Sequence, residues 1–272
     1  MATPTVISRS LGRGKALIGM VHVPALPGTP TSKRTVAQLC SHVAGEARLL
    51  AKAGFDALLI ENMHDTPYVT RHDAAVVAAM TAAALAVREA VPNLPLGVQV
   101  LAAGNREALA VAHAAGGTFI RCENFVFSHV ADEGLMPTAE AGELLRYRRS
   151  IGAEAVAVFA DLKKKHASHA ITGDISLAEV CHAAEFFRAD GVIITGAHTG
   201  DPASEGDLAE AKRACALPIL VGSGVTTANI SAMFTRADAL IVGSSLKRGG
   251  HWAAPLDAKR CAAIVKAADK AR

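Results

Sequence analysis

The sequence contains few aromatic residues, which make up only 4% of its 272 positions. Proteins that bind single-stranded nucleic acid commonly stack the bases on aromatic side chains. The net charge of +3 comes from lysines and arginines that are scattered along the chain rather than gathered in blocks. This composition argues against a nucleic-acid partner and against binding to an anionic membrane surface.

A hydrophobic run long enough to cross a membrane is also missing. The longest run, from Ala74 to Val87, is interrupted by Thr81 and spans about fourteen residues, fewer than a bilayer requires. The N-terminal residues lack the apolar segment of a secretory signal. The five cysteines include no C-x-x-C pair, and their odd number fits reduced thiols. We therefore expect a cytoplasmic protein without a transmembrane segment.

No G-x-G-x-x-G follows any strand-like segment, which argues against an open dinucleotide-binding sheet. Instead, apolar runs alternate with Ala- and Glu-rich segments of helical periodicity from end to end. The predicted strands span residues 16–23, 57–62, 96–101, 118–124, 155–162, 191–196, 218–224 and 239–245. The predicted helices span residues 35–53, 73–91, 105–115, 138–151, 177–189, 205–214, 227–234 and 257–270. Eight strands that are each followed by a helix indicate a closed barrel.

The sequence thus predicts an α/β protein with one domain over residues 1–272, a single (β/α)8 TIM barrel. No linker, low-complexity tract or change of composition divides the chain, and residues 1–14 are expected to form a flexible N-terminal lead. The alanine-rich helix at 74–86 fits packing on the barrel and equally fits packing on a second copy of the chain. The sequence is therefore compatible both with a monomer and with a homo-oligomer.

Two apolar strands near the C-terminus end abruptly in small residues. These are Gly222, Ser223 and Gly224 in the first strand tail and Gly243, Ser244 and Ser245 in the second. Small side chains let backbone N–H groups close on an anion, and (β/α)8 barrels often hold a phosphate after strands seven and eight. We predict that the two tails bind a phosphate group; the alternative is close packing at the barrel end.

Polar residues stand at the ends of the other six predicted strands. They are His22, Glu61, Asn62, Gln99, Arg121, Glu123, Asn124, Asp161, Lys163 and Thr195. Polar side chains inside a barrel are costly unless they are paired. Because the carboxyl ends of all barrel strands meet at one face, these residues predict a polar pocket opposite the phosphate-binding tails.

The residue types suggest how the pocket divides its work. The candidate catalytic residues are Glu61, Glu123, Asp161 and Lys163 for proton transfer and His22 for polarising a substrate oxygen. The candidate substrate-binding residues are Asn62, Gln99, Arg121, Asn124 and Thr195.

Some of these residues also have a structural interpretation. Glu61 and Arg121 could form an ion pair inside the barrel mouth, and His22 could be a hydrogen-bonded core histidine. Lys164 and Lys165 are expected to point to solvent. The polar pocket therefore rests on the convergence of many residues rather than on any one of them.

The histidines invite a metal interpretation. His166 and His169 form an H-x-x-H pair in a predicted loop, and His198 follows the sixth strand. No cysteine or carboxylate accompanies the pair at the spacing of a zinc site. We therefore predict no metal site, while a metal-dependent hydrolase that also uses His22 stays an alternative. The sequence does not indicate a cofactor.

Residues 18–30, Ile-Gly-Met-Val-His-Val-Pro-Ala-Leu-Pro-Gly-Thr-Pro, resemble the opening signature of the BtpA family, which includes the SgcQ-like proteins. Further matches are Gly-Phe-Asp-Ala at 54–57, Arg-Cys-Glu-Asn at 121–124, Phe-Ala-Asp at 159–161 and Val-Gly-Ser-Gly-Val at 221–225. The resemblance covers nearly the whole chain. It implies a fold similar to that of the ribulose-phosphate-binding barrels.

The resemblance implies less about chemistry. The founding member of the family is linked to the accumulation of photosystem I in cyanobacteria, and SgcQ-like relatives are associated with sugar metabolism. Relatives often carry a histidine where this chain has Lys163, so a histidine-based role does not transfer to that position.

We predict an enzyme that acts on a small phosphorylated metabolite, a sugar or nucleoside phosphate, by acid–base chemistry such as isomerisation or lyase-type cleavage. One alternative is a non-catalytic assembly or biogenesis factor whose partner surface lies in residues 125–136 or 24–30. The other is the metal-dependent hydrolase.

Overall fold

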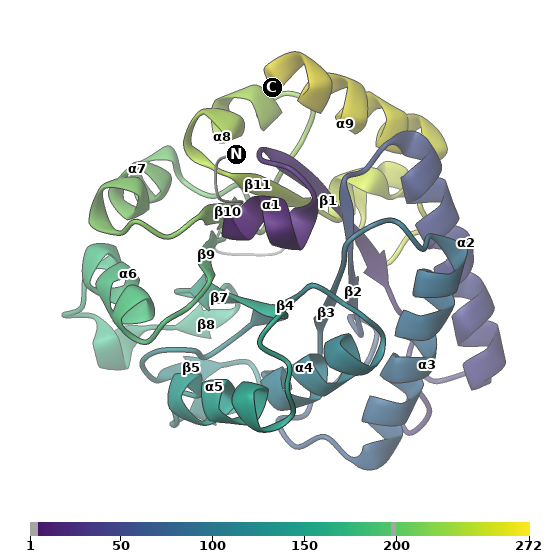
Figure 1. Ribbon diagram of the computed structural model, residues 1–272, viewed down its shortest axis with the longest axis horizontal. Helices are drawn as coiled ribbons and strands as arrows, with labels where there is room; N and C mark the ends of the chain where they lie inside the picture. The colour runs from purple at the N-terminus through teal and green to yellow at the C-terminus, as the bar shows by residue number, and fades with distance from the viewer. Residues whose placement is uncertain (1–4, 197–199) are drawn as a thin grey trace.

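The computed structural model describes residues 5–196 and 200–272, and the central feature is a closed barrel of parallel strands (Figure 1). The barrel strands are β1 (Ala16–His22), β2 (Ala57–Glu61), β3 (Leu96–Gln99), β4 (Phe119–Cys122), β7 (Ala157–Leu162), β9 (Gly191–Ile194), β10 (Ile219–Val221) and β11 (Ala239–Val242). They follow one another around the ring in chain order, and β11 pairs with β1 to close it. The predicted (β/α)8 barrel is confirmed.

Helices surround the barrel at the predicted places (Figure 1). They are α2 (Val36–Ala53), α3 (Ala74–Ala90), α4 (Asn105–Ala114), α5 (Ala141–Ser150), α6 (Leu177–Phe186), α7 (Glu205–Ala214), α8 (Ile230–Arg236) and α9 (Ala258–Ala271). Sequence signals set several of their starts. Thr35 and Gln38 form a capping box at the start of α2, and Ser176 and Glu179 form another at α6. Among the described residues, no helix is both long and apolar enough to cross a membrane.

The barrel interior is a packed apolar core. Inward side chains such as Leu59, Phe119, Phe159 and Ile241 are buried and form one cluster. The Phe119 ring takes the space where a side chain at position 97 would start: a Cβ built on Gly97 would lie 2.2 Å from Cε2 of Phe119. The barrel is therefore filled with side chains below its carboxyl end, as in other (β/α)8 barrels.

The N-terminal lead differs from the expectation of a flexible segment. Residues Val6–Leu11 form helix α1, which crosses the amino end of the ring of strands in Figure 1. Ile7 and Leu11 are buried and join the interior cluster of the barrel. The Thr118 hydroxyl also donates a hydrogen bond of 2.7 Å to the Ser10 carbonyl. These residues are ordered because they cover apolar core that would otherwise meet water.

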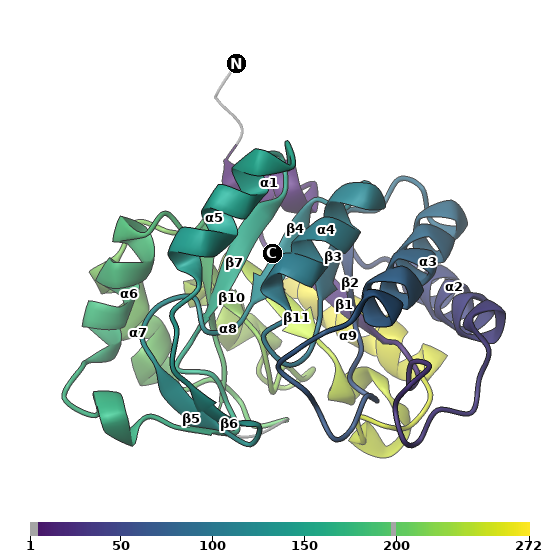
Figure 2. The same ribbon diagram turned by 90° about the horizontal axis from the view of Figure 1, so that it is seen from below.

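The insertions at the carboxyl face build a small second sheet. It consists of β5 (His129–Ala131), β6 (Gly134–Met136) and β8 (Ala167–Ser168), paired antiparallel. The 3-10 turns η1 (Ala170–Thr172), η2 (Ser244–Leu246) and η3 (Arg248–Gly250) lie in the loops. In Figure 2, β5 and β6 lie at the end of the barrel opposite α1. This sheet joins the loops after β4 and β7 into one wall over the carboxyl end of the barrel.

Candidate active site

A cavity of about 190 Å³ opens at the carboxyl end of the barrel between the two glycine–serine tails. Its lining includes Gly222, Ser223, Gly224, Val225 and Thr226 from the first tail and Gly243, Ser244 and Ser245 from the second. The opposite side is lined by His22, Glu61, Arg121 and Lys165. The structure thus brings the predicted phosphate-binding tails and several of the predicted catalytic residues to one cavity.

The tails offer backbone rather than hydroxyl groups to an anion. The Ser223 hydroxyl accepts from the Gly196 N–H and donates to the Asp201 carbonyl, both at 2.8 Å, and the Ser245 hydroxyl donates to the Val225 carbonyl at 2.6 Å. Within residues 5–196 and 200–272, the backbone N–H groups of Gly224 and Ser244 donate no hydrogen bond to other backbone atoms. Two of the three predicted serine hydroxyls are therefore occupied, which leaves the backbone N–H groups and the Ser244 hydroxyl as donors.

Two glycines bring the tails close to catalytic candidates. A Cβ built on Gly222 would lie 3.4 Å from Nη2 of Arg121, and one built on Gly243 would lie 3.6 Å from Nε2 of His22. An anion held by the tails would therefore lie next to these two side chains. Arg260 adds a second cation: it lines the same cavity, and its Nε donates to the Ser245 carbonyl at 2.8 Å. No sequence motif marked Arg260.

A second, larger space of about 510 Å³ continues from the first. The two share Glu61, Met63, Arg121 and Lys165 in their walls. The larger space is also lined by Gln99, Glu123, Asp161, Lys164 and Trp252. Its size and polar walls suit the part of a substrate that extends beyond a phosphate group.

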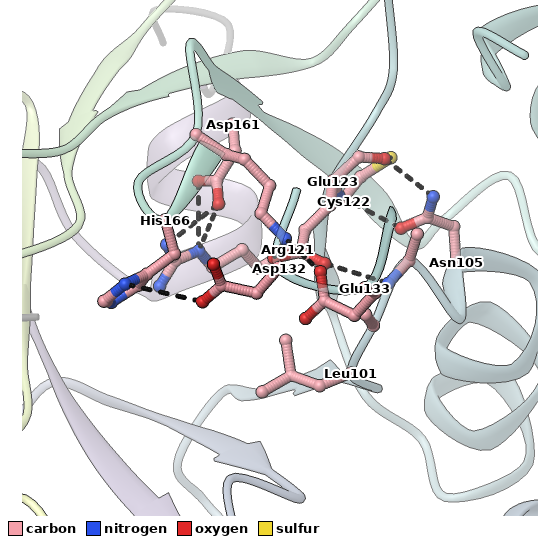
Figure 3. Close-up of polar contacts among 12 residues, drawn as sticks. Leu101, Asn105, Arg121, Cys122, Glu123, Asp132, Glu133, Asp161 and His166 are labelled. Carbon is pink, nitrogen blue, oxygen red and sulfur yellow. Dashed lines mark hydrogen bonds and ion pairs between the residues drawn. The ribbon is translucent and has the colours of Figure 1, made fainter. Parts of the chain in front are cut away.

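Arg121 is held by Asp161 (Figure 3). Its Nε lies 3.0 and 3.1 Å from the two carboxylate oxygens, and its Nη2 lies 2.8 Å from Oδ2. Arg121 therefore pairs with Asp161 and not with Glu61, the partner that the sequence suggested. The register explains this. Strand β4 pairs with β7, which places Arg121 opposite Phe159, two residues before Asp161 and on the same face, whereas Glu61 lies two strands away on β2.

Glu123 is held by Lys164, which the sequence led us to expect in solvent. The Lys164 ammonium lies 3.2 Å from Glu123 Oε1 and 3.7 Å from Glu133, and the Ala103 N–H donates to Glu123 Oε2 at 2.9 Å. Burial opposes the charged carboxylate, but Lys164 and the Ala103 N–H bring the pKa of Glu123 below its usual value. Glu123 is thus an ionised member of a buried pair and is poorly suited to donate a proton.

Glu61 differs from the other two carboxylates because no lysine or arginine of the described residues forms an ion pair with it. Its Oε2 lies 4.0 Å from Nε2 of His22. Burial raises the pKa of Glu61 above its ordinary value. A raised pKa makes a buried carboxyl better suited to donate a proton than an ordinary carboxylate.

His22 is neutral and has a fixed orientation. Burial, reinforced by the charge of Lys247, lowers the pKa of His22 to about 3. Its Nδ1 lies 3.3 Å from the Trp252 carbonyl, so Nδ1 carries the proton and donates, which leaves the Nε2 lone pair facing Glu61. His22 is therefore a buried, hydrogen-bonded histidine, as one of the two interpretations expected, and it also lines the cavity.

Lys163 does not enter the pocket, contrary to the prediction. Its side chain is exposed and its ammonium donates to the Ile175 carbonyl at 3.0 Å. The backbone turns here through positive φ values, 47° at Lys163 and 55° at His166, so side-chain alternation along β7 does not continue. Lys165, which was expected in solvent, instead lines both cavities.

Two predicted substrate-binding asparagines support loops instead. Asn62 accepts from the Leu101 N–H at 2.7 Å and donates to Asp65 at 2.9 Å. Asn124 donates to the Thr138 carbonyl at 2.6 Å and lies outside both cavities. These contacts hold the loops that frame the pocket.

Gln99 and Thr195, both predicted to bind substrate, lie in different places. Gln99 lines the larger space, and its buried Oε1 accepts no hydrogen bond from the described part of the chain. The Thr195 methyl packs beneath the first tail, 2.9 Å from where a Cβ on Gly222 would lie, and its hydroxyl is likewise unsatisfied. Gln99 is therefore placed to meet a substrate, and Thr195 to support the tail.

The predicted histidines do not gather into a metal site within the described residues. His166 lies 3.9 Å from Asp132, while His169 contacts the His129 ring and the Lys164 carbonyl. No group of three metal-ligating side chains occurs in residues 5–196 and 200–272. His198 lies outside these residues.

Solved structures with this architecture include phosphate-handling proteins. (S)-3-O-geranylgeranylglyceryl phosphate synthase from Thermoplasma acidophilum, solved with sn-glycerol-1-phosphate, aligns with a TM-score of 0.59 at 16% identity and covers 98% of this chain and 100% of its own. Thiamine phosphate pyrophosphorylase from Pyrococcus furiosus aligns with a TM-score of 0.58 at 12% identity, covering 97% and 98%. At these identities the likeness shows the fold alone.

Sequence relatives are closer. An uncharacterized mitochondrial protein of Caenorhabditis elegans is 43% identical over 98% of both chains. The photosystem I biogenesis protein BtpA of Synechocystis is 36% identical and covers 92% of this chain and 87% of its own. The sequence profile of the BtpA family matches residues 13–270. The chain therefore belongs to the BtpA family.

Proposed function

We propose that this chain is an enzyme that binds a small phosphorylated metabolite, a sugar or nucleoside phosphate, and moves a proton at a hydroxyl or carbonyl group of that metabolite. Isomerisation and lyase-type cleavage both need such a step. Five free cysteines fit a cytoplasmic setting for this reaction.

The observation that carries the proposal is the shared cavity. The backbone of the two tails and the side chains of His22, Glu61 and Arg121 line one space of about 190 Å³. A phosphate held by the tails fixes one end of the substrate, and the adjoining space of about 510 Å³ takes the other. Fixing a substrate this way converts binding energy into orientation, which is a large part of catalysis.

The chemistry follows from the protonation states. Burial raises the pKa of Glu61, which favours its protonated form, and in this proposal Glu61 donates the proton to a substrate oxygen. The His22 Nε2 accepts a hydrogen bond from a substrate hydroxyl or from Glu61 itself, because the ring is neutral and Nδ1 is engaged. Arg121, kept ionised by Asp161, stabilises negative charge that develops on the substrate.

The solved structures support the phosphate-binding part of the proposal. One aligned chain carries sn-glycerol-1-phosphate as substrate, and another is a phosphoribosyl anthranilate isomerase from Thermus thermophilus. Both share the barrel in which strands seven and eight commonly bind phosphate. The position of the tails in this chain, after β10 and β11, is the equivalent one.

A thermal-shift screen against sugar and nucleoside phosphates, each paired with its dephosphorylated form, tests this function. We expect phosphorylated compounds to raise the melting temperature and their dephosphorylated forms not to. Trp252, the single tryptophan of the sequence, lines the larger space and gives an independent fluorescence signal for the same titration.

Ser244 offers a matched pair of variants for this screen, because its side chain lines the cavity at the start of η2. Ser244→Asp places a negative charge in the phosphate cradle and should abolish the shift, whereas Ser244→Asn, of similar size but neutral, should keep most of it. Gly222 is a poor choice, since a Cβ there would lie 2.6 Å from Ile193. Absence of a shift across the whole phosphorylated panel contradicts the proposed function.

The rival proposal is a non-catalytic assembly factor. It draws on the name of the Synechocystis relative and on Val130 and Leu135, which are exposed on the β5–β6 hairpin. A polar double variant, Val130→Thr with Leu135→Gln, would disrupt a partner interface but leave the ligand shift intact. A cellular phenotype that follows the hairpin variant and ignores Glu61→Gln would favour the assembly role.

A further inference from the structure

Most buried charges at the barrel mouth are neutralised in pairs. Arg121 pairs with Asp161, and Lys164 pairs with Glu123 (Figure 3 shows Arg121, Glu123 and Asp161). Among the titratable groups of the two cavities outside these pairs, Glu61 and His22 are buried and Lys165 is half-buried. Within residues 5–196 and 200–272, no hydrogen bond or ion pair holds the Lys165 ammonium.

Lys165 lies where the two cavities meet. It lines both the phosphate-side cavity and the larger space, together with Glu61 and Arg121. The charges that act on it come from Arg121 on β4, Glu61 on β2, Asp161 on β7 and Glu123 after β4. Burial, followed by repulsion from Arg121, lowers the pKa of Lys165 below its ordinary value despite the three carboxylates.

A structural lysine in this position would be expected to have a partner, since an unpaired buried ammonium is costly. Lys164 illustrates the paired alternative one residue earlier, at 3.2 Å from Glu123. An amine that is unpaired, half-buried and next to a bound substrate is instead suited to nucleophilic attack.

We propose that the Nζ of Lys165 forms a Schiff base with the carbonyl carbon of a phosphorylated aldehyde or ketone held in this site. This inference rests on the proposed phosphate-binding function and narrows it. The substrate class becomes small phosphorylated carbonyl compounds, including sugar phosphates in their open-chain form.

The step balances with the groups present. The Nζ lone pair attacks the carbonyl carbon, and one proton moves from the nitrogen to the former carbonyl oxygen to give a carbinolamine. Glu61 then protonates that hydroxyl, which leaves as water while the nitrogen lone pair forms the C=N bond. The products are one water molecule, a protonated imine and the Glu61 carboxylate. The cationic imine withdraws electrons from the neighbouring carbon, as isomerisation or carbon–carbon cleavage requires.

Borohydride trapping tests the proposal on the full chain. Pyridoxal 5′-phosphate is the general probe because it carries a phosphate and an aldehyde; dihydroxyacetone phosphate and ribose 5-phosphate are the carbonyl metabolites. Each is incubated with the protein, reduced, and mapped by peptide mass spectrometry. We expect the dominant adduct on Lys165, formed faster than on the exposed Lys163, because a lowered pKa leaves a larger fraction of the Lys165 amine neutral and nucleophilic.

Lys163 gives the matched control, since it lies two residues away and its side chain is exposed. Lys165→Met should abolish the adduct, whereas Lys163→Met should leave it unchanged, and inorganic phosphate should slow labelling by competing for the tails. Lys163→Met should also keep the thermal shift with a phosphorylated ligand. A shift without any adduct on Lys165 overturns the Schiff base but leaves phosphate binding standing. No shift and no adduct overturns both.

Discussion

Replacing Asp161 by asparagine removes the negative charge from the buried ion pair between Arg121 and Asp161 at the mouth of the barrel. The Arg121 side chain is 5% exposed and that of Asp161 is 1% exposed, and three N–O contacts of 2.8 to 3.1 Å join them. Asparagine keeps the size of the side chain but removes its charge. The guanidinium then stays buried without a counter-ion.

Breaking a buried pair from one side costs about 3–5 kcal/mol. For a chain of this size, 1 kcal/mol corresponds to roughly 2–4 °C in melting temperature. Asp161→Asn should therefore lower the melting temperature by roughly 6–20 °C. The double variant Asp161→Asn with Arg121→Met should recover much of the loss, because the uncompensated charge is gone.

Circular dichroism melts and urea titrations measure these effects. Glu154→Gln is the control, because Arg149 and Glu154 form an ion pair with side chains 82% and 43% exposed, and its loss should not measurably change the melting temperature. If Asp161→Asn melts within error of Glu154→Gln, or if the double variant is less stable than Asp161→Asn, the reasoning about this pair is wrong.

Further expectations concern pH and the amino end of the barrel. Burial raises the pKa of Glu61, so the folded state holds that proton more tightly than the unfolded state, and this stabilisation is lost as the pH rises through the raised pKa. Glu61→Gln should therefore raise the melting temperature more at pH 8 than at pH 5. Equal changes in melting temperature at the two pH values would count against a raised pKa. Burial lowers the pKa of His22 to about 3, so below pH 6.5 the unfolded state binds one proton more, and the free energy of unfolding falls there by about 1.4 kcal/mol per pH unit. In urea titrations, the free energy of unfolding of His22→Gln should fall less steeply with decreasing pH than that of the unsubstituted protein. An unchanged pH dependence would refute the lowered pKa. Leu11→Ala should lower the free energy of unfolding, measured in urea, by about 2–5 kcal/mol, since Leu11 is fully buried at the amino end of the barrel. Arg9→Ala is the control, because Arg9 is exposed on the same helix. A decrease no larger than that of Arg9→Ala would mean that α1 does not close the barrel.

The barrel could be predicted because each strand is recognisable from its own short segment of sequence. Each is a continuous apolar run, as for strands buried on both faces, and the helices between them carry their own caps and periodicity. Helix α1 escaped notice because six residues give too short a window for periodicity, and only the tertiary contacts of Ile7 and Leu11 order it.

The candidate site could be predicted in part. Convergence at the carboxyl face located His22, Glu61 and the two tails, because barrel topology brings strand ends together whatever follows them. The choice among Lys163, Lys164 and Lys165 could not be made from sequence. A positive φ at Lys163 breaks the alternation of β7, and nothing in three consecutive lysines signals which one turns inward.

The partner of Arg121 shows the same limit. Glu61 and Asp161 both end strands of the barrel, and only the register between β4 and β7 decides in favour of Asp161. That register depends on pairing between segments far apart in sequence. Pairing of charges inside a barrel mouth is therefore a tertiary property.

The position of a bound phosphate shows whether the two glycine–serine tails form the phosphate site. A crystal structure with the phosphorylated compound that gives the largest thermal shift should show its phosphate against the backbone N–H groups of Gly224 and Ser244, with the rest of the molecule extending toward Glu61. A phosphate bound elsewhere, for example beside Lys33 and Arg34 in the neighbouring hollow on the other side of His22, would contradict this assignment. So would tails that stay free of ligand at saturating concentration.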